Sequence, residues 1–176
     1  MFNRSSFGLG GRFYGGFWQG LPKLIRSQLT LDAEATVELD YSGCHVRMLA
    51  AELGVDLGAG DIYEVTGWPR HQVKVAMLVL INALTLRSAI GRIALDLGGG
   101  AGRAVRLIAA IKARHPGLAG AFHTGAGLRL MRLDADIADE VFARLLRRGI
   151  VALGVHDSFI ASRKNEGDLR TETRAI

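Results

Sequence analysis

The chain has 176 residues, 49% of them hydrophobic, which is typical of one folded domain and excludes a largely disordered protein. Lys and Arg number 22 against 17 Asp and Glu, and the resulting formal net charge of +5 is compatible with a polyanionic partner. The single cysteine excludes an internal disulfide, and no apolar run reaches the roughly 20 residues of a membrane span, so we expect a cytoplasmic protein that does not contact membranes.

A Gly- and aromatic-rich segment makes up residues 1–35, ahead of the main domain. Its glycines are too frequent for a stable helix, so we expect a loop or an irregular strand over residues 1–20. Cations and aromatic rings alternate here as in proteins that bind single-stranded nucleic acid, although the same side chains could equally pack over the domain that follows. They are Arg12, Phe13, Tyr14, Trp18 and Lys23.

A buried strand is predicted over residues 36–40, followed by a helix over residues 44–53. Asp40 closes the apolar run, where the end of a strand would hold its carboxylate rigidly at the edge of a sheet. Alternation along the strand is expected to point Glu38 away from any site that Asp40 forms. The other reading of Asp40 is a simple helix cap or turn former.

The middle of the chain is predicted to be helical, with interruptions at glycine and proline. A short helix is expected over residues 61–66 and a longer one over residues 70–84. The glycines of residues 91–102 predict a flexible or tightly turned stretch, and a basic amphipathic helix is expected over residues 103–114.

The last third of the chain is predicted to hold one more helix and then a β-hairpin. Asp134 or Asp136 is expected to cap the helix, and Gly149 to end it. The β-rich runs over residues 150–155 and 158–162 follow at once, which predicts two paired strands.

Only His156 and Asp157 separate the two hairpin strands, so their side chains are expected at a tight turn. Asp157 therefore resembles Asp40 in lying where a buried strand ends. Two such carboxylates from strands far apart in sequence are what a pair of Mg²⁺ ions requires. The polar residues 163–176 are expected to form a frayed tail.

Several short motifs follow one another along the chain. In order they are Asp40-Tyr41-Ser42 followed by Arg47, Asp61-Ile62-Tyr63, Arg70-x-x-x-Lys74, Leu133-Asp134-Ala135-Asp136-Ile137-Ala138, and His156-Asp157 between two strands. This succession resembles the signature of family A DNA polymerases and the related single-subunit RNA polymerases. In that family the first aspartate opens motif A, the arginine and lysine lie on the fingers helix of motif B, and His-Asp forms the turn of motif C.

The resemblance spans about residues 37–162 and implies an α+β fold built on a small antiparallel, palm-like sheet backed by helices. On this interpretation residues 36–162 form the catalytic core. A helical, fingers-like insertion is expected at about residues 61–130.

The resemblance also implies the residues of the site. Asp40 and Asp157, with the backbone carbonyl of Tyr41, would hold two Mg²⁺ ions. Arg70 and Lys74 lie one helical turn apart and would face a triphosphate, although they could also be an ordinary solvated helix face. The remaining expected site residues are His156 beside the primer end, and Arg47, His45 and Asn82 in substrate binding.

The chain differs from the DNA polymerases of the family at four positions. His45 stands where they have a Glu that helps to exclude the 2′-hydroxyl, so the choice of sugar stays open. Asn82 and Ala83 replace the usual Tyr-Gly pair beside the incoming base. Ser158 after the His-Asp pair resembles the RNA polymerases, so the type of template stays open as well.

The sequence therefore predicts template-directed nucleotidyl transfer of the DNA polymerase type, with Mg²⁺, nucleoside triphosphates and a nucleic acid primer-template. We expect a role in DNA replication of a phage or plasmid. The alternative is a catalytically silent nucleic-acid-binding module that keeps the fold within a replication complex, with a protein partner there. A third possibility, a two-metal nuclease, requires more carboxylates near the two aspartates.

Overall fold

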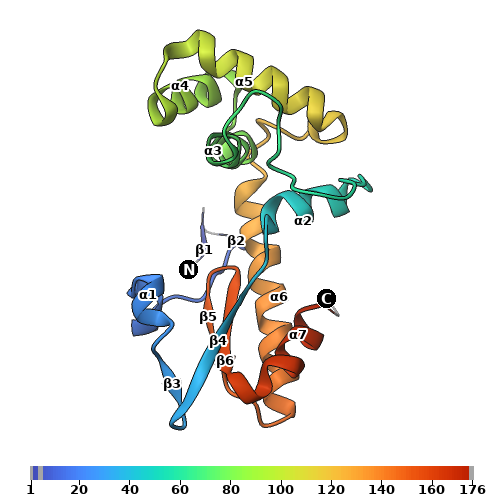
Figure 1. Ribbon diagram of the computed structural model, residues 1–176. Helices are drawn as coiled ribbons and strands as arrows, with labels where there is room; N and C mark the ends of the chain where they lie inside the picture. Colours follow the sequence, from blue (N-terminus) through green and yellow to red (C-terminus); the bar gives the residue numbers. More distant parts are fainter. Residues whose placement is uncertain (1, 4–5, 175–176) are drawn as a thin grey trace. The chain divides into compact units, whose positions relative to one another are not determined.

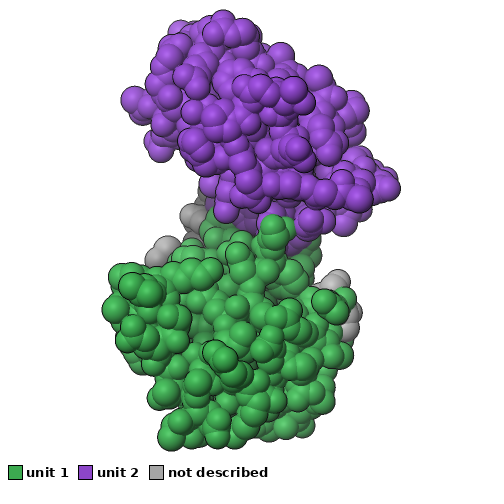
Figure 2. All heavy atoms as spheres, viewed as in Figure 1, with its two compact units in different colours: residues 1–42, 131–176 green, residues 43–130 purple. Residues whose placement is uncertain are grey.

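The computed structural model describes residues 2–3 and 6–174 (Figure 1). Over these residues it is an α+β protein with seven α-helices and a four-stranded antiparallel sheet, which confirms the predicted α+β class and the antiparallel sheet. The chain divides into two compact units, residues 1–42 with 131–176 (unit 1) and residues 43–130 (unit 2), coloured separately in Figure 2. No helix in the described part of the chain has the length and apolar character needed to cross a membrane.

Unit 1 is built on the four-stranded sheet, in the order β3-β4-β6-β5. Pairing between β4 and β6 places Asp40 opposite Ser158, and the predicted hairpin pairs β5 with β6. The predicted strand that ends at Asp40 is also confirmed, although it begins two residues earlier than expected. The strands are β3 (Thr30–Leu31), β4 (Glu34–Asp40), β5 (Ala152–Val155) and β6 (Ser158–Ser162).

The N-terminal segment contributes short elements to unit 1. Strands β1 (Phe2–Asn3) and β2 (Ser6–Gly10) pair in a small sheet of their own, which fits the expected irregular strand. The 3-10 helix η1 (Phe17–Gly20) and the one-turn helix α1 (Lys23–Arg26) follow. Residues 1, 4 and 5, which belong to the same prediction, lie outside the described residues.

The core of unit 1 lies between the sheet and helices α6 (Gly127–Arg147) and α7 (Glu166–Arg174), which lie along one side of it (Figure 1). One sheet face supplies Phe159 and Ala161, and the residues of α6 from position 131 onward that belong to unit 1 supply an apolar stripe. Removal of these apolar side chains from water favours folding of the unit. The buried cluster consists of Ala138, Val141, Leu145, Ile150, Phe159, Ala161 and Leu169.

Helix α7 replaces the frayed tail expected after residue 163, so that expectation is wrong for Glu166–Arg174. Leu169 is fully buried in the core, and the Tyr41 hydroxyl donates a hydrogen bond to the Thr173 carbonyl at 2.6 Å. A short 3-10 turn, η3 (Arg163–Asn165), leads into the helix. A buried leucine, a tertiary hydrogen bond and ion pairs from Arg148 to Asp168 and Glu172 therefore hold a segment whose composition is almost entirely polar.

Helix α6 begins at Gly127, so the prediction that Asp134 or Asp136 caps it is wrong. Asp134 lies within the helix and is buried, and its carboxylate accepts a hydrogen bond from Nε of Arg12 at 2.5 Å. The ion pair with Arg12 compensates this buried charge, so the carboxylate does not depend on the free backbone N–H groups of a helix start. The predicted end is confirmed, because α6 stops at Arg147 and Gly149 adopts the left-handed φ of 70°.

Unit 2 is helical. Helices α2 (Cys44–Glu52) and α3 (Arg70–Asn82) confirm the two predicted helices on either side of residues 61–66. Residues 61–66 themselves form turns and an isolated bridge between Val65 and Trp68, so the short helix expected there is wrong. The Asp61 carboxylate accepts a hydrogen bond from the Tyr63 backbone N–H at 3.0 Å, an aspartate turn that competes with helix formation.

Helix α4 (Leu86–Leu97) contradicts the flexible or tightly turned stretch expected over residues 91–102 as far as Leu97, whereas Gly98 and Gly99, both at positive φ, form the turn that follows it. A capping box between Thr85 and Ser88 starts the helix, and Ala89 and Ile93 are buried on its inner side. This burial outweighs the cost of about 1 kcal/mol for a glycine inside the helix. The basic helix is confirmed as α5 (Gly100–Arg114), and the 3-10 turn η2 (Pro116–Leu118) follows it.

A buried histidine makes the stability of unit 2 depend on pH. His115 is 4% exposed, and its Nε2–H donates to the Ile62 carbonyl at 2.8 Å. Burial lowers the pKa of His115 below its usual 6.5, so the unfolded chain binds the proton more tightly than the folded one. The stabilisation is therefore complete above the unfolded-state pKa and is lost as the pH falls below it.

We expect the melting temperature of the protein to decrease between pH 7.5 and pH 5.5, and the variant His115→Gln to lose most of this decrease. We attribute the rest of the decrease to His123, because burial also lowers the pKa of that side chain. Melting curves followed by circular dichroism at several pH values measure the effect, with the exposed His71→Gln as the control. An unchanged pH dependence in His115→Gln contradicts the prediction.

Candidate active site

The sheet of unit 1 brings Asp40 and Asp157 together. Asp40 is the last residue of β4 and lies opposite Ser158, the first residue of β6. The Tyr41 backbone N–H donates a hydrogen bond to the Asp157 carbonyl oxygen at 3.0 Å. The predicted convergence of these two strand ends, far apart in sequence, is therefore confirmed at the level of the backbone.

The turn that carries Asp157 is the tip of the hairpin. His156 adopts a left-handed φ of 55°, a conformation that histidine tolerates better than most residues and that two-residue hairpins require. Asp40 and His156 are exposed and Asp157 is half-buried, so solutes can reach this edge of the sheet. The His156 ring also lies edge-on to Tyr14, with 6.1 Å between the ring centroids.

The donor set at this edge fits Mg²⁺ that binds together with a phosphate-bearing substrate. Mg²⁺ prefers oxygen ligands and commonly takes one or two protein carboxylates, with water and substrate phosphates for the rest. Asp40 and Asp157 supply two carboxylates, and the described residues contain no cluster of three or more His, Cys, Asp or Glu that could hold an ion alone. The Tyr41 hydroxyl is bonded to α7, so its backbone carbonyl is the group that Tyr41 can offer.

Glu38 lies on the same sheet face as Asp40, because it pairs with Ile160 two positions along β6. The expectation that it points away is wrong, since residues two apart in a strand share a face. Its carboxylate accepts hydrogen bonds from Nε and Nη2 of Arg26 at 2.9 and 2.8 Å, and from the Ser158 hydroxyl at 3.0 Å. The hydrogen bond from Arg26 lowers the pKa of Glu38, so this carboxylate stays ionised and the Arg26 guanidinium balances its charge.

We expect Glu38→Gln to lower the free energy of unfolding by about 1.5–3 kcal/mol, because it removes charge-assisted hydrogen bonds from a partly buried pair. Urea denaturation measures the loss. Glu140→Gln, which breaks the more accessible, half-buried i,i+4 pair with Arg144 in the same unit, is the control, with an expected loss of about 0.5 kcal/mol or less. Equal losses in the two variants contradict the structural role of Glu38.

In unit 2, Arg70 and the Asp61-Ile62-Tyr63 motif form one cluster. The Arg70 guanidinium is paired with the Asp61 carboxylate and lies over the Tyr63 ring, 5.2 Å from its centroid. The hydrogen bond from Arg70 also lowers the pKa of Asp61. The Asp61-Ile62-Tyr63 motif and Arg70 therefore meet at the start of α3. Lys74 is exposed on the next turn of this helix.

The other predicted substrate-binding residues lie on α2 and at the end of α3. His45 is half-buried and Arg47 is exposed on α2. Asn82 donates a hydrogen bond to the Leu78 carbonyl at 2.8 Å, and its amide occupies the space that a Cβ on Gly127 would need. Asn82 is therefore part of the packing at this helix end.

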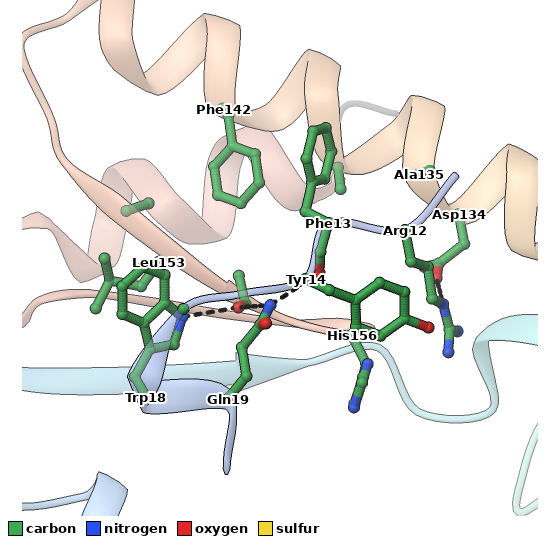
Figure 3. Close-up of a pocket in the computed structure, with 14 residues that line it drawn as sticks. Arg12, Phe13, Tyr14, Trp18, Gln19, Asp134, Ala135, Phe142, Leu153 and His156 are labelled. Atoms are coloured by element: carbon green, nitrogen blue, oxygen red, sulfur yellow. Dashed lines mark hydrogen bonds and ion pairs between the residues drawn. The ribbon is translucent and has the colours of Figure 1, made fainter. Parts of the chain in front are cut away.

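A cavity of about 300 Å³ in unit 1 was missed by sequence reasoning. Its walls come from the N-terminal segment, α6, β5 and His156, and Figure 3 shows the side chains around it. The Phe142 ring packs directly against Gly154. A Cβ atom at Gly154 would lie only 2.8 Å from Cζ of Phe142, so a larger residue would clash with the ring. The alternating cations and aromatic rings of residues 12–23 were the signal available in the sequence.

Comparisons with models of protein families, with curated proteins and with solved structures find no match to this chain. The resemblance to family A polymerases therefore depends on the sequence motifs alone.

Proposed function

We propose that the chain is a template-directed nucleotidyltransferase of the DNA polymerase type, which transfers a nucleoside monophosphate unit from a triphosphate to a 3′-hydroxyl and releases pyrophosphate. The observation that carries the proposal is the position of Asp40 and Asp157 at the ends of adjacent strands, both accessible to solvent. Two Mg²⁺ ions held there, with the Tyr41 carbonyl, would supply Lewis-acid stabilisation of the developing negative charge. In this proposal the sheet of unit 1 is palm-like and the helices of unit 2 are fingers-like.

The residues of the chain have distinct roles in the proposal. His156 orients the primer end from the hairpin turn. Arg70 and Lys74 bind the triphosphate, and the positive end of the α3 dipole adds to their attraction for phosphate. Asp61 orients the Arg70 guanidinium through their ion pair. His45 and Arg47 remain predicted contributors to substrate binding, as does Asn82.

One observation favours a second function, a catalytically silent nucleic-acid-binding module of a phage or plasmid replication complex. Asn82 stands where the family has a tyrosine beside the incoming base, and its side chain is bonded to its own helix. A nuclease is less favoured, because the Arg26 guanidinium already pairs with Glu38, a further carboxylate on the Asp40 face of the sheet.

Primer extension tests the proposal. A labelled primer-template is incubated with the protein, Mg²⁺ or Mn²⁺ and either deoxy- or ribonucleoside triphosphates, and binding to the same primer-template is measured in parallel. Extension supports the polymerase, whereas binding without extension supports the silent module. Shortening of the primer without added nucleotides would instead indicate a nuclease.

We expect Lys74→Met and Arg70→Met to raise the KM for the nucleoside triphosphate about 10-fold or more, which corresponds to one lost charge-assisted contact of about 1.4 kcal/mol. Affinity for the primer-template should change little. Steady-state extension kinetics measure both quantities, with the exposed Arg92→Met of α4 as the control. A KM that equals the control value in both variants contradicts the assigned role.

A further inference from the structure

The cavity of unit 1 has aromatic walls from three separate elements. Phe13 and Tyr14 come from the N-terminal segment, Trp18 from η1 and Phe142 from α6. The rings of Phe13 and Phe142 meet edge to face, with 6.1 Å between their centroids (Figure 3). Tyr14 is 53% exposed at the mouth and Phe13 is 52% exposed, so the cavity opens to solvent.

Hydrogen bonds hold the N-terminal wall in place. The Trp18 indole N–H donates to the Gly154 carbonyl at 3.0 Å. The Gln19 amide donates to the carbonyls of Gly154 and Phe13 at 3.1 and 2.9 Å, and it accepts from the Gly15 N–H at 3.2 Å. The wall is therefore fastened to the edge strand β5 before any ligand arrives, which reduces the entropic cost of binding.

Polar groups stand at the rim of this aromatic cavity. The ion pair of Arg12 and Asp134 closes one end, with only 5% of the Asp134 side chain exposed. The Tyr14 hydroxyl and the His156 ring also line the cavity, and Figure 3 shows these two side chains together. A ligand that fits must have a flat apolar face for the walls and hydrogen-bonding groups at its edge for the rim.

We infer that this cavity binds one unpaired nucleobase, carried either by a free nucleotide or by a nucleotide of a single strand. Aromatic side chains stack on bases of every sequence, and the basic charge of the chain favours a ligand that carries phosphate. A volume of about 300 Å³ lies at the lower end of the roughly 300–1,000 Å³ usual for small-molecule pockets, which suits one base. The inference goes beyond the proposed function, because it requires neither metal nor catalysis.

Tryptophan fluorescence tests the inference directly. The chain has two tryptophans, so Trp68→Phe in unit 2 leaves Trp18 in the cavity wall as the only indole. This protein is titrated with deoxyadenosine monophosphate, with a single-stranded oligodeoxynucleotide, and with ribose 5-phosphate, which lacks a base. We expect saturable quenching by the first two and none by the third, and the ratio of the two affinities tells which source the cavity prefers.

Variants at the mouth make the test specific to the cavity. Tyr14→Ala should weaken binding about 10-fold, in keeping with loss of one stacking contact, whereas Tyr14→Phe should keep most of the affinity. Leu24→Ala, an exposed apolar residue of the same segment outside the cavity, should have no effect. Absence of quenching, equal quenching by ribose 5-phosphate, or unchanged affinity in Tyr14→Ala overturns the inference.

The test also separates the inference from the proposed function. Asp157→Asn should leave the quenching unchanged, because Asp157 does not line the cavity. A protein that binds the base but never extends a primer disproves the polymerase and leaves the inference standing. Extension without quenching disproves the inference alone.

Discussion

Asp157→Asn is expected to reduce the rate of single-nucleotide incorporation about 10³-fold, because loss of a metal-binding carboxylate removes about 4 kcal/mol of transition-state stabilisation. Asp40→Asn is expected to have an effect of the same size, since its strand end adjoins the turn that carries Asp157. Both side chains lie at the solvent-accessible edge of the sheet, so both variants should fold and should still bind primer-template. Single-turnover extension with excess enzyme measures the rate.

Asp136→Asn is the matched control for these variants. It makes the same change of charge at an exposed position of α6, where Asp136 pairs with Arg132. We expect its rate of incorporation to stay within a factor of two or so of the parent, as is usual for a surface substitution. If Asp136→Asn loses as much activity as the other two, the effect is one of net charge and the assignment of Asp40 and Asp157 is wrong.

Leu169→Ala is expected to lower the free energy of unfolding of unit 1 by about 2–5 kcal/mol, the usual cost of a large-to-small change at a fully buried leucine. Leu169 is the one buried residue of α7 and touches the core that supports β6. Loss of its side chain removes the anchor of the helix. Urea denaturation monitored by circular dichroism measures the change.

Arg170→Ala provides the comparison on the same helix. Arg170 is exposed and, among the residues that the structure describes, its side chain pairs only with Glu166 one turn away, so its replacement should cost about 0.5 kcal/mol or less. A small loss in Leu169→Ala, equal to that of the control, would mean that residues 166–174 do not pack on the core in solution.

Local sequence signals predicted the elements that depend on local interactions. The hairpin follows from two β-rich runs separated by two residues, and the end of α6 follows from Gly149. Helix α7 was missed because one buried leucine gives no periodic stripe. Helix α4 was missed because Gly91 lowers the local propensity, while burial of Ile93 by the rest of unit 2 decides the outcome.

The candidate site was predictable to the extent that it lies in contiguous motifs. Asp40 and Asp157 could be placed together because each ends a strand of recognisable pattern. The pairing of Glu38 with Arg26 depends on how α1 docks on the sheet, which no local pattern reveals. The cavity likewise needs the N-terminal segment, α6 and β5 in contact, and only the folded chain brings these segments together.

Paramagnetic broadening by Mn²⁺ tests most directly whether the two strand ends form one metal site. Mn²⁺ replaces Mg²⁺ at oxygen ligands and broadens the NMR signals of nearby amides. We predict that small amounts of Mn²⁺, added with a nucleoside triphosphate, broaden the amide signals of Asp40 and Tyr41 together with those of Asp157 and Ser158, and that Asp40→Asn abolishes both effects. Broadening confined to other acidic residues, with both strand ends unaffected, would contradict the account.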